Sequence, residues 1–424
     1  MKAVVCPPPS RARRSAAALA LALSLVFAAP ACREADDAVT VTPRTLRDVP
    51  AERLAFRFEP DVAEENLPEP LKAEASDAKL ESVQRDFETR RPGDALIRTV
   101  LSPDGQRALA VYATSEIQDP DFRLDLYGAD GMFIRNILPA DMIGTFPDSV
   151  AWSPDGRHIA FTGVRNPLNA AAPDPGRETT APADPGASPD ALATPASAPT
   201  VAPIIQSVQT FSTEQIYVCN RDGFELKPLT ARDGLIYFGL SWAPDSSAVA
   251  AIACREDEWN GRKERGDSPG GRPRIVTLDG QERLLDDRLS DAAPAWSPDA
   301  SKVAAAFDKT VAVYDAAGAR PTAANLPLTN PLWASSVAYD ARHVRKDGGQ
   351  PPPAAESQAA KDVPPVGSVV INSFNPVVRL AWLAPDALFV QTAFVRFYRN
   401  DPVPVTTYPR WHVVRLYPQA AVVS

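Results

Sequence analysis

Few residues of this 424-residue chain have the chemistry of a catalytic or metal site. The three histidines, His158, His343 and His412, are far apart, and no Cys-x-x-Cys pair accompanies them, so their spacing suits neither a metal site nor a general base. No G-x-S-x-G pattern of a hydrolase nucleophile is present. The repeated "PDG" turns (Asp104, Asp155) offer one carboxylate each, too few for a calcium cage. We therefore expect no catalytic residue, no metal and no cofactor.

The N-terminus has the pattern of an export signal. Lys2 and "RARR" (11–14) are positive, "SAAALALALSLVFAA" (15–29) is apolar but short for a membrane span, and "APAC" (29–32) offers a cleavage site. This pattern resembles a bacterial lipoprotein signal, with Ala29 where Leu is usual. It implies a signal peptide over 1–31, lipidation at Cys32, and an address in the periplasm or outer membrane. Plain secretion after Ala31 and an uncleaved anchor are the alternatives.

Charge and cysteine content restrict the partners and the folding chemistry. The formal charge is −9, and removal of residues 1–31 takes away four positive charges and leaves −13. An acidic protein repels phosphate, which argues against a nucleic-acid partner. Cys219 and Cys254 remain beyond the signal. They either form a disulfide, as exported proteins often do, or are buried as small apolar residues.

One motif recurs along the chain and predicts the architecture. It is clearest as "AWSPDGRHIAF" (151–161), and its copies start at Val100, Ser241, Ala295 and Ala381. An alternating strand, a turn in which Pro fixes φ and Gly accepts positive φ, and a second alternating strand form each copy. The motif prolines are 51, 90, 54 and 87 residues apart; without the Pro/Ala-rich residues 167–204 the gap of 90 becomes 52, and the gap of 87 has room for an extra unit, marked by Trp333. Six units of this length are typical of propeller blades.

The repeat resembles the TolB-type, WD-like β-propeller repeat of bacterial envelope proteins. The matching residues are the "AWSPDG" copies, "IYVCNRDGFELKPLT" (216–230), and the weaker "LDLYGADGMFI" (124–134) and "VAVYDAAGA" (311–319). The resemblance covers roughly residues 97–418 and implies an all-β, six-bladed β-propeller of four-stranded antiparallel blades, a fold often used for protein contacts. Fold alone does not imply an activity.

The remaining segments are expected to surround the propeller (97–424). Residues 32–52 read as a flexible tether, and 53–96 as an N-terminal segment in which "RLAFRFEP" (53–60) is a candidate strand to complete the last blade. Residues 167–204 and 347–366 are Pro/Ala-rich insertions that we expect to be disordered.

A partner-binding rim is the strongest functional expectation. All the long loops (165–214, 256–273 and 395–410) fall between the second and third strands, so one face is elaborated, and the crossovers into the first strands share that face. Residues upstream of each motif would ring the channel mouth there: Phe146, Asp148, Tyr237, Phe238, Asp291, Asn330, Phe374 and Asn375. Acidic residues at the mouth favour a basic peptide or protein segment. Packing of these aromatics between blades is the alternative.

The sequence therefore predicts a monomeric, lipid-anchored, non-enzymatic module that binds a protein or peptide partner of the cell envelope. A propeller lyase or hydrolase with a site over the channel is the first rival, and a structural paralogue without a ligand is the second.

Overall fold

The computed structural model describes residues 46–72, 79–114, 121–165, 211–343, 370–398 and 401–419, without the side chains of 339–343, 370–374, 394–398 and 401–408. Residues 43–424 form one compact unit. The expected signal peptide, Cys32 and the insertions 167–204 and 347–366 lie outside the described residues.

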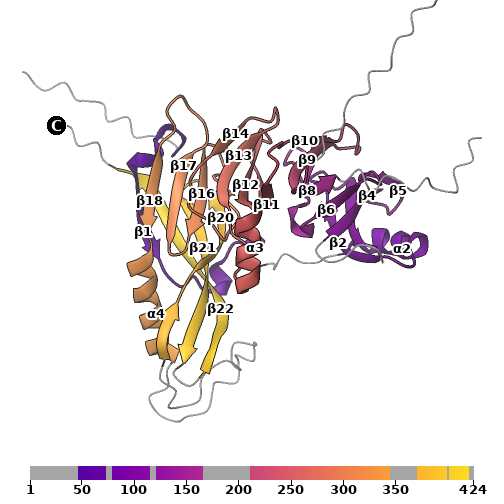
Figure 1. The fold of residues 1–424 in the computed structure, drawn as a ribbon. Helices are drawn as coiled ribbons and strands as arrows, with labels where there is room; N and C mark the ends of the chain where they lie inside the picture. Colours follow the sequence, from indigo (N-terminus) through magenta and orange to yellow (C-terminus); the bar gives the residue numbers. More distant parts are fainter. Residues whose placement is uncertain are drawn as a thin grey trace, which may run out of the picture. The chain divides into compact units, whose positions relative to one another are not determined.

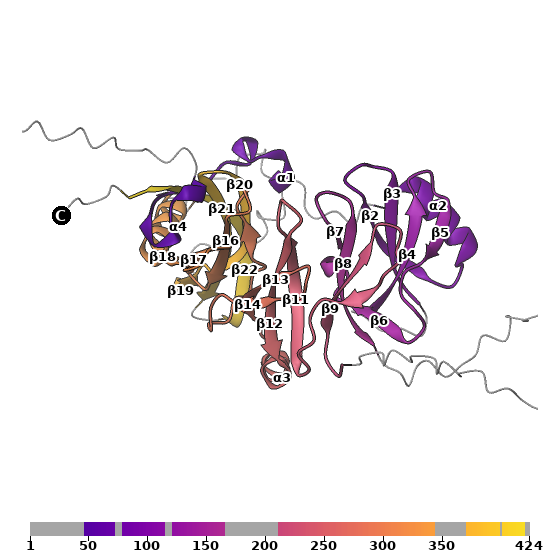
Figure 2. The same cartoon turned by 90° about the horizontal axis from the view of Figure 1, so that it is seen from above.

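The described chain is mostly β, and its strands form four antiparallel sheets, of nine, four, four and five strands. The nine-stranded sheet consists of two four-stranded groups joined by one further strand, so we describe five four-stranded groups in succession and call them sheets 1 to 5 (Figures 1 and 2). Sheet 1 contains β2 (Ala95–Leu101), β3 (Arg107–Ala113), β4 (Asp121–Gly128) and β5 (Phe133–Asn136). Sheet 2 contains β7 (Ala151–Trp152), β8 (His158–Arg165), β9 (Gln215–Asn220) and β10 (Lys227–Pro228). Sheet 3 contains β11 (Leu235–Trp242), β12 (Ala248–Arg255), β13 (Arg272–Thr277) and β14 (Glu282–Leu284). Sheet 4 contains β15 (Ala295–Trp296), β16 (Lys302–Phe307), β17 (Thr310–Asp315) and β18 (Ala323–Pro327), and sheet 5 contains β20 (Val377–Ala384), β21 (Ala387–Tyr398), β22 (Asp401–Pro418) and β1 (Leu54–Glu59).

Two further strands and several helices connect or cover these sheets. Strand β6 (Met142–Thr145) pairs with β4 and β8 and so joins sheets 1 and 2, while β19 (Val370–Phe374) pairs with β21. The α-helices are α1 (Glu69–Lys72), α2 (Glu81–Arg90), α3 (Glu256–Arg265) and α4 (Thr329–His343). Short 3-10 turns are η1 (Leu46–Asp48), η2 (Ala51–Arg53), η3 (Glu64–Asn66) and η4 (Pro147–Ser149).

The motif turn is held by its own side chains. In the second copy Ser153 Oγ donates to Asp155 Oδ1 (2.6 Å), and the backbone N–H of His158 donates to Ser153 Oγ (2.9 Å). Asp155 Oδ1 also accepts the N–H of Arg157 (3.0 Å). The first and fourth copies repeat these contacts through Ser102 with Asp104 and Ser297 with Asp299. The carboxylates are thus used as turn caps.

Consecutive sheets pack face to face through apolar clusters. Leu109 and Phe161 belong to the cluster between sheets 1 and 2, and Ala160 and Tyr237 to the cluster between sheets 2 and 3. Trp296 packs with Ala250 between sheets 3 and 4. Sheets 4 and 5 share a larger cluster, whose sheet residues are Leu54, Ala295, Ala304, Ala306, Val311, Val313, Ala324, Leu326, Val377, Leu380, Trp382, Leu388, Val390, Val414 and Leu416.

The N-terminal segment completes sheet 5. Strand β1 pairs antiparallel with β22, with Leu54 opposite Pro418 and Glu59 opposite Val413. The segment expected to finish the last sheet therefore takes that position. This pairing covers the outer edge of β22 over its last six residues, which limits edge-to-edge association.

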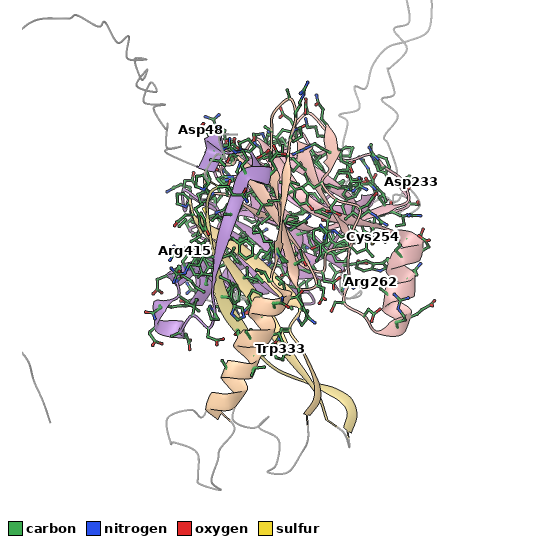
Figure 3. All side chains as sticks on the ribbon, turned by 90° about the vertical axis from the view of Figure 1, so that its left-hand side faces the viewer. Asp48, Asp233, Cys254, Arg262, Trp333 and Arg415 are labelled. Atoms are coloured by element: carbon green, nitrogen blue, oxygen red, sulfur yellow. The ribbon has the colours of Figure 1, made fainter. Side chains whose placement is uncertain are left out.

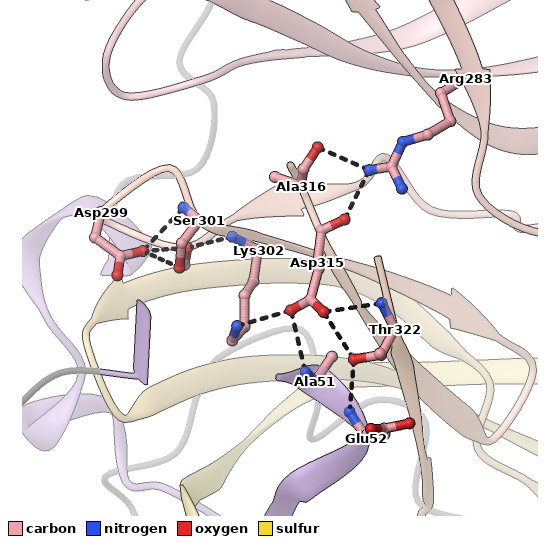
Figure 4. A network of polar contacts seen from close by, with 10 residues as sticks. Ala51, Glu52, Arg283, Asp299, Ser301, Lys302, Asp315, Ala316 and Thr322 are labelled. Atoms are coloured by element: carbon pink, nitrogen blue, oxygen red, sulfur yellow. Dashed lines mark hydrogen bonds and ion pairs between the residues drawn. The ribbon is translucent and has the colours of Figure 1, made fainter. Parts of the chain in front are cut away.

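The residues just before β1 are packed rather than free, contrary to the tether expected up to residue 52. Asp315 Oδ1 accepts hydrogen bonds from the N–H of Ala51 (3.0 Å) and from buried Lys302 Nζ (2.9 Å), and Thr322 Oγ1 accepts one from the N–H of Glu52 (3.1 Å) (Figure 4). Ala51 is fully buried, and Leu46 and Val49 join the cluster between sheets 4 and 5. Buried apolar side chains and satisfied backbone groups fix this stretch.

The expected count of six blades is not confirmed. The segment around Trp333, expected to form the fifth unit, is helix α4, and Trp333 is exposed. The outer face of sheet 1 is covered by Val83 and Phe87 of α2. The outer face of sheet 5 is covered by Leu67 and Leu71. In the described ranges, helical segments of the N-terminal region thus occupy the sheet faces that blades would cover in a closed ring.

Turn geometry generates a stability prediction. The fourth residue of the turn has positive φ in four copies: Gly105 (+67°), Gly156 (+68°), Ser246 (+63°) and Ala300 (+58°). Ala300 has a left-handed backbone conformation that is unfavourable for alanine but not for glycine, so Ala300→Gly should raise the free energy of unfolding by about 0.5–1 kcal/mol.

Ser246→Gly is the control for this substitution. It also removes the hydroxyl that accepts the N–H of Asp155 (3.0 Å), so it should not raise the free energy of unfolding. Urea denaturation measures both; destabilisation by Ala300→Gly would contradict the strain argument.

Candidate functional site

Helix α3 is inserted between β12 and β13, and aromatic and acidic residues from neighbouring sheets gather around it. Its Trp259 forms an aromatic group with Phe146 and Phe238, with ring centroids 5.3 to 5.8 Å apart. Phe146 precedes η4 and has positive φ (+59°), a strained conformation for a bulky residue. Phe146 and Trp259 are half-buried, whereas Phe238 is buried. Through these ring contacts, the helix connects Phe146, which precedes the first strand of sheet 2, with Phe238 in sheet 3.

Ion pairs fix α3 at both ends. Near its start, Glu258 accepts two hydrogen bonds from the Arg272 guanidinium (2.7 and 2.8 Å), which hold the pKa of Glu258 at about 2. Towards its end, Arg262 Nη2 donates to Asp291 Oδ1 (2.7 Å), just before sheet 4 (Arg262 and Cys254 are labelled in Figure 3). Gly266 ends the helix in the left-handed conformation (φ +71°).

Carboxylates with raised pKa values surround α3. Partial burial raises the pKa of Glu214, with a further contribution from Asp121 and Glu256. Partial burial also raises the pKa of Asp291, although Arg262 opposes the shift, and nearby Asp308 adds to it. In the part of the chain that the structure describes, Glu214 has no cationic partner. Carboxylates perturbed in this way mark places where an incoming cation is favoured.

We use the name α3 rim for this surface: α3 with Phe146, Asp148, Glu214, Asp291 and Asp308. Three of its members, Phe146, Asp148 and Asp291, are expected from the sequence. Asp148 is exposed, and the side chain of Asp291 is 47% exposed. Glu214, Asp308 and Trp259 were not expected. The acidic start of α3, "EDE" (256–258), directly after a strand was the available signal for a helix there.

The other expected rim residues lie elsewhere. Tyr237 is fully buried between sheets 2 and 3 and donates its hydroxyl to Glu282 Oε2 (3.0 Å), so it is a core residue. Phe238 is also buried, and its ring packs at a steep angle against Trp259. Asn375 is buried and donates from Nδ2 to Ser336 Oγ (2.7 Å). Asn330 is exposed on α4, and the side chain of Phe374 lies outside the described residues.

Two hollows lie apart from the α3 rim. One, of about 370 Å³, is bounded by the inner strands of sheets 3, 4 and 5 near Trp242, Trp296 and Trp382. The other, of about 880 Å³, lies beside the packed N-terminal segment and includes Lys302 and Asp315 in its wall. Because Lys302 and Asp315 already pair with each other, they present little uncompensated charge to a ligand.

His412 belongs to a buried polar cluster with a structural arrangement. The N–H of Asp61 donates to His412 Nδ1 (3.2 Å), so the ring proton is on Nε2, which faces Thr392 Oγ1 (3.0 Å). A ring that donates to a hydroxyl cannot at the same time accept its proton as a general base. Burial, aided by Arg410, lowers the pKa of His412 to about 4.

The two cysteines that the structure describes are free thiols. Cys219 lies in sheet 2 and Cys254 in sheet 3, both buried, and burial raises the pKa of each to about 12. Thiols of this kind are poor nucleophiles at neutral pH. Among the described residues, no group of three His, Cys, Asp or Glu side chains could hold a metal ion, and no helix is long and apolar enough to cross a membrane.

Comparisons with known proteins give distant likenesses only. No protein-family model and no curated protein matches the chain. Among solved structures it is similar to a TolB candidate from Agrobacterium tumefaciens (12% identity, 76% of each chain, TM-score 0.28) and to a nidogen/laminin complex (10%, 87% of this chain and 99% of that chain, 0.34). It is also similar to an oligogalacturonate lyase in complex with manganese (12%, 85% and 74%, 0.35). Likenesses at this level do not decide an activity, and the description of the fold rests on the sheets themselves.

The His412 cluster generates a pH prediction. With a pKa near 6.5 unfolded and about 4 folded, His412 takes up its proton more readily in the unfolded state. Its contribution to stability is therefore present above pH 6.5 and is lost as the pH falls towards 4, amounting to about 3 kcal/mol. His412→Gln, whose amide can accept from Asp61 and donate to Thr392, should flatten the melting temperature between pH 7 and pH 4.5, whereas His158→Gln should not. Parallel wild-type and His412→Gln profiles would contradict the assignment.

Proposed function

We propose that this protein is a non-enzymatic binding module of the bacterial cell envelope, and that the α3 rim binds a basic segment of a protein or peptide partner. The observation that carries the proposal is Glu214, a half-buried carboxylate beside Asp121 and Glu256 without a cationic partner in the described ranges. A lysine or arginine side chain from a partner would relieve this repulsion.

The aromatic residues of the rim support the same partner chemistry. Phe146 and Trp259 are half-buried and pack against each other, so part of each ring is open to contact. Cation–π contact with such rings adds to ion pairing for lysine and arginine side chains. Rigid aromatic side chains lose little entropy on binding and often carry much of the contact energy.

Export and anchoring complete the proposal. The positive start, the short apolar stretch and Cys32 directly after "APA" support lipidation at Cys32 and a place in the periplasm or outer membrane. Attachment through one acylated residue would leave residues 43–424 free to act as a monomeric binding unit.

Binding of charged peptide probes tests the function. A labelled deca-lysine peptide should bind with an affinity that falls as salt rises, and deca-glutamate should not bind. Glu214→Gln, Asp291→Asn and Asp308→Asn together should weaken deca-lysine binding about tenfold or more, because these charges lie at the contact.

The matched control changes the net charge equally but outside the α3 rim. Glu64→Gln, Glu65→Gln and Glu88→Gln alter three exposed carboxylates of the N-terminal segment. If both triple variants lose the same affinity for deca-lysine, the effect comes from net charge and not from the α3 rim. If the wild type does not bind deca-lysine, the proposal of a basic partner is wrong.

A further inference from the structure

Helix α4 has its polarity reversed relative to an ordinary surface helix. Its inward side carries Ser335 and Ser336, which are buried, together with Leu332. Its outward side carries Trp333 and Val337, whose exposed fractions are 65% and 49%. A helix on a soluble surface normally turns its apolar stripe inward. Here two serines occupy the inward face while a tryptophan is open to solvent.

Hydrogen bonds hold the helix in this orientation. Ser336 Oγ accepts from Asn375 Nδ2 (2.7 Å) and donates to the carbonyl of Leu332 (2.9 Å). Ser335 Oγ contacts the Arg410 guanidinium, and Arg410 Nε donates to Asp61 Oδ1 (2.9 Å). Rolling α4 to bury Trp333 would leave these buried polar groups without partners, at considerable cost. The outward position of Trp333 is therefore built into the fold.

The chain topology places an aromatic-rich arm beside α4. The arm consists of β19 and the ends of β21 and β22 (394–398 and 401–408), and both views show it alongside α4 (Figures 1 and 3). We call α4 with this arm the appendage. Seven of its 33 residues are aromatic, against 8% in the whole chain: Trp333, Tyr339, Phe374, Phe394, Phe397, Tyr398 and Tyr408. Its formal charge is zero, from two arginines and two aspartates, whereas the chain carries −9.

We propose that the appendage rests on a lipid bilayer, with Trp333 and Val337 in the interfacial layer. Tryptophan and tyrosine favour the boundary between headgroups and hydrocarbon. An uncharged segment avoids the repulsion that the acidic remainder of the protein meets at anionic headgroups. Trp333 and Val337 together expose roughly 200–250 Å², far below the approximately 800 Å² per partner of a stable protein interface. A small apolar contact of this size suits a reversible membrane attachment better than a protein complex.

Flotation with vesicles tests this contact. The full chain carrying Cys32→Ser, so that no acyl group contributes, is mixed with vesicles of phosphatidylethanolamine and phosphatidylglycerol. The protein should float with the vesicles, and Trp333→Asp with Val337→Asp should lower the bound fraction about tenfold or more. Met132→Asp, which changes another exposed apolar side chain (69%) in the β4–β5 connection, should leave binding unchanged.

Three outcomes would overturn the proposal: no flotation of the Cys32→Ser chain, equal flotation of the Trp333/Val337 variant, or equal loss with Met132→Asp. Because Trp333 and Val337 are exposed, the variant should keep the melting temperature of its parent, which separates lost contact from unfolding. Self-association abolished by the variant without any vesicle binding would instead assign the face to a second copy. Binding of deca-lysine is independent of all these results, so failure here leaves the α3 rim untouched.

Discussion

The same kind of hydrogen bond joins one sheet to the next at three places, and the succession of sheets depends on it. The indole N–H of three of the four motif tryptophans donates to a backbone carbonyl of the preceding sheet's inner strand: Trp152 to Val100 (3.0 Å), Trp242 to Ala151 (3.3 Å) and Trp296 to Ser241 (2.9 Å). The inner strand has no neighbour on that side within its own sheet, so its carbonyls need an external donor. The tryptophan ring thereby fills the gap between two sheets, and its N–H provides a hydrogen bond to a carbonyl at the sheet edge.

This bridge ends at sheet 5. Trp382 donates instead to the carbonyl of Pro385 in its own turn (3.4 Å), and sheets 4 and 5 are held by the apolar cluster and by the N-terminal segment. Ala51 on Asp315 and β1 on β22 tie that segment to both sheets. The outer faces of sheets 1 and 5 are covered by α2 and by Leu67 and Leu71.

The repeat, its turns and its strands could be predicted because their determinants are local. Alternation gives β8 and β12, and the Ser, Asp and Gly of the turn bond within five residues of one another. The helices at α3 and α4 could not be predicted in the same way, since they interrupt the repeat and depend on distant partners. Ser335 reaches Arg410, and Trp259 reaches Phe146. The sequence position of a residue, just upstream of a motif, does not predict whether its side chain is buried. Asp148 is exposed and Tyr237 is buried, because burial depends on the sheet that faces each residue.

The account depends most on the tryptophan bridge, and a matched pair of substitutions tests it. Trp296 and Trp382 are about equally buried, at 7% and 5% exposed, but only the indole N–H of Trp296 donates to a carbonyl of another sheet. Replacement by phenylalanine removes similar volume at both sites. Trp296→Phe breaks the 2.9 Å bond to the Ser241 carbonyl of another sheet, whereas Trp382→Phe breaks only the longer 3.4 Å bond within its own turn. By urea denaturation, Trp296→Phe should lower the free energy of unfolding by about 1 kcal/mol more than Trp382→Phe. Equal losses, or a larger loss for Trp382→Phe, would contradict the claim that these hydrogen bonds hold the sheets in succession.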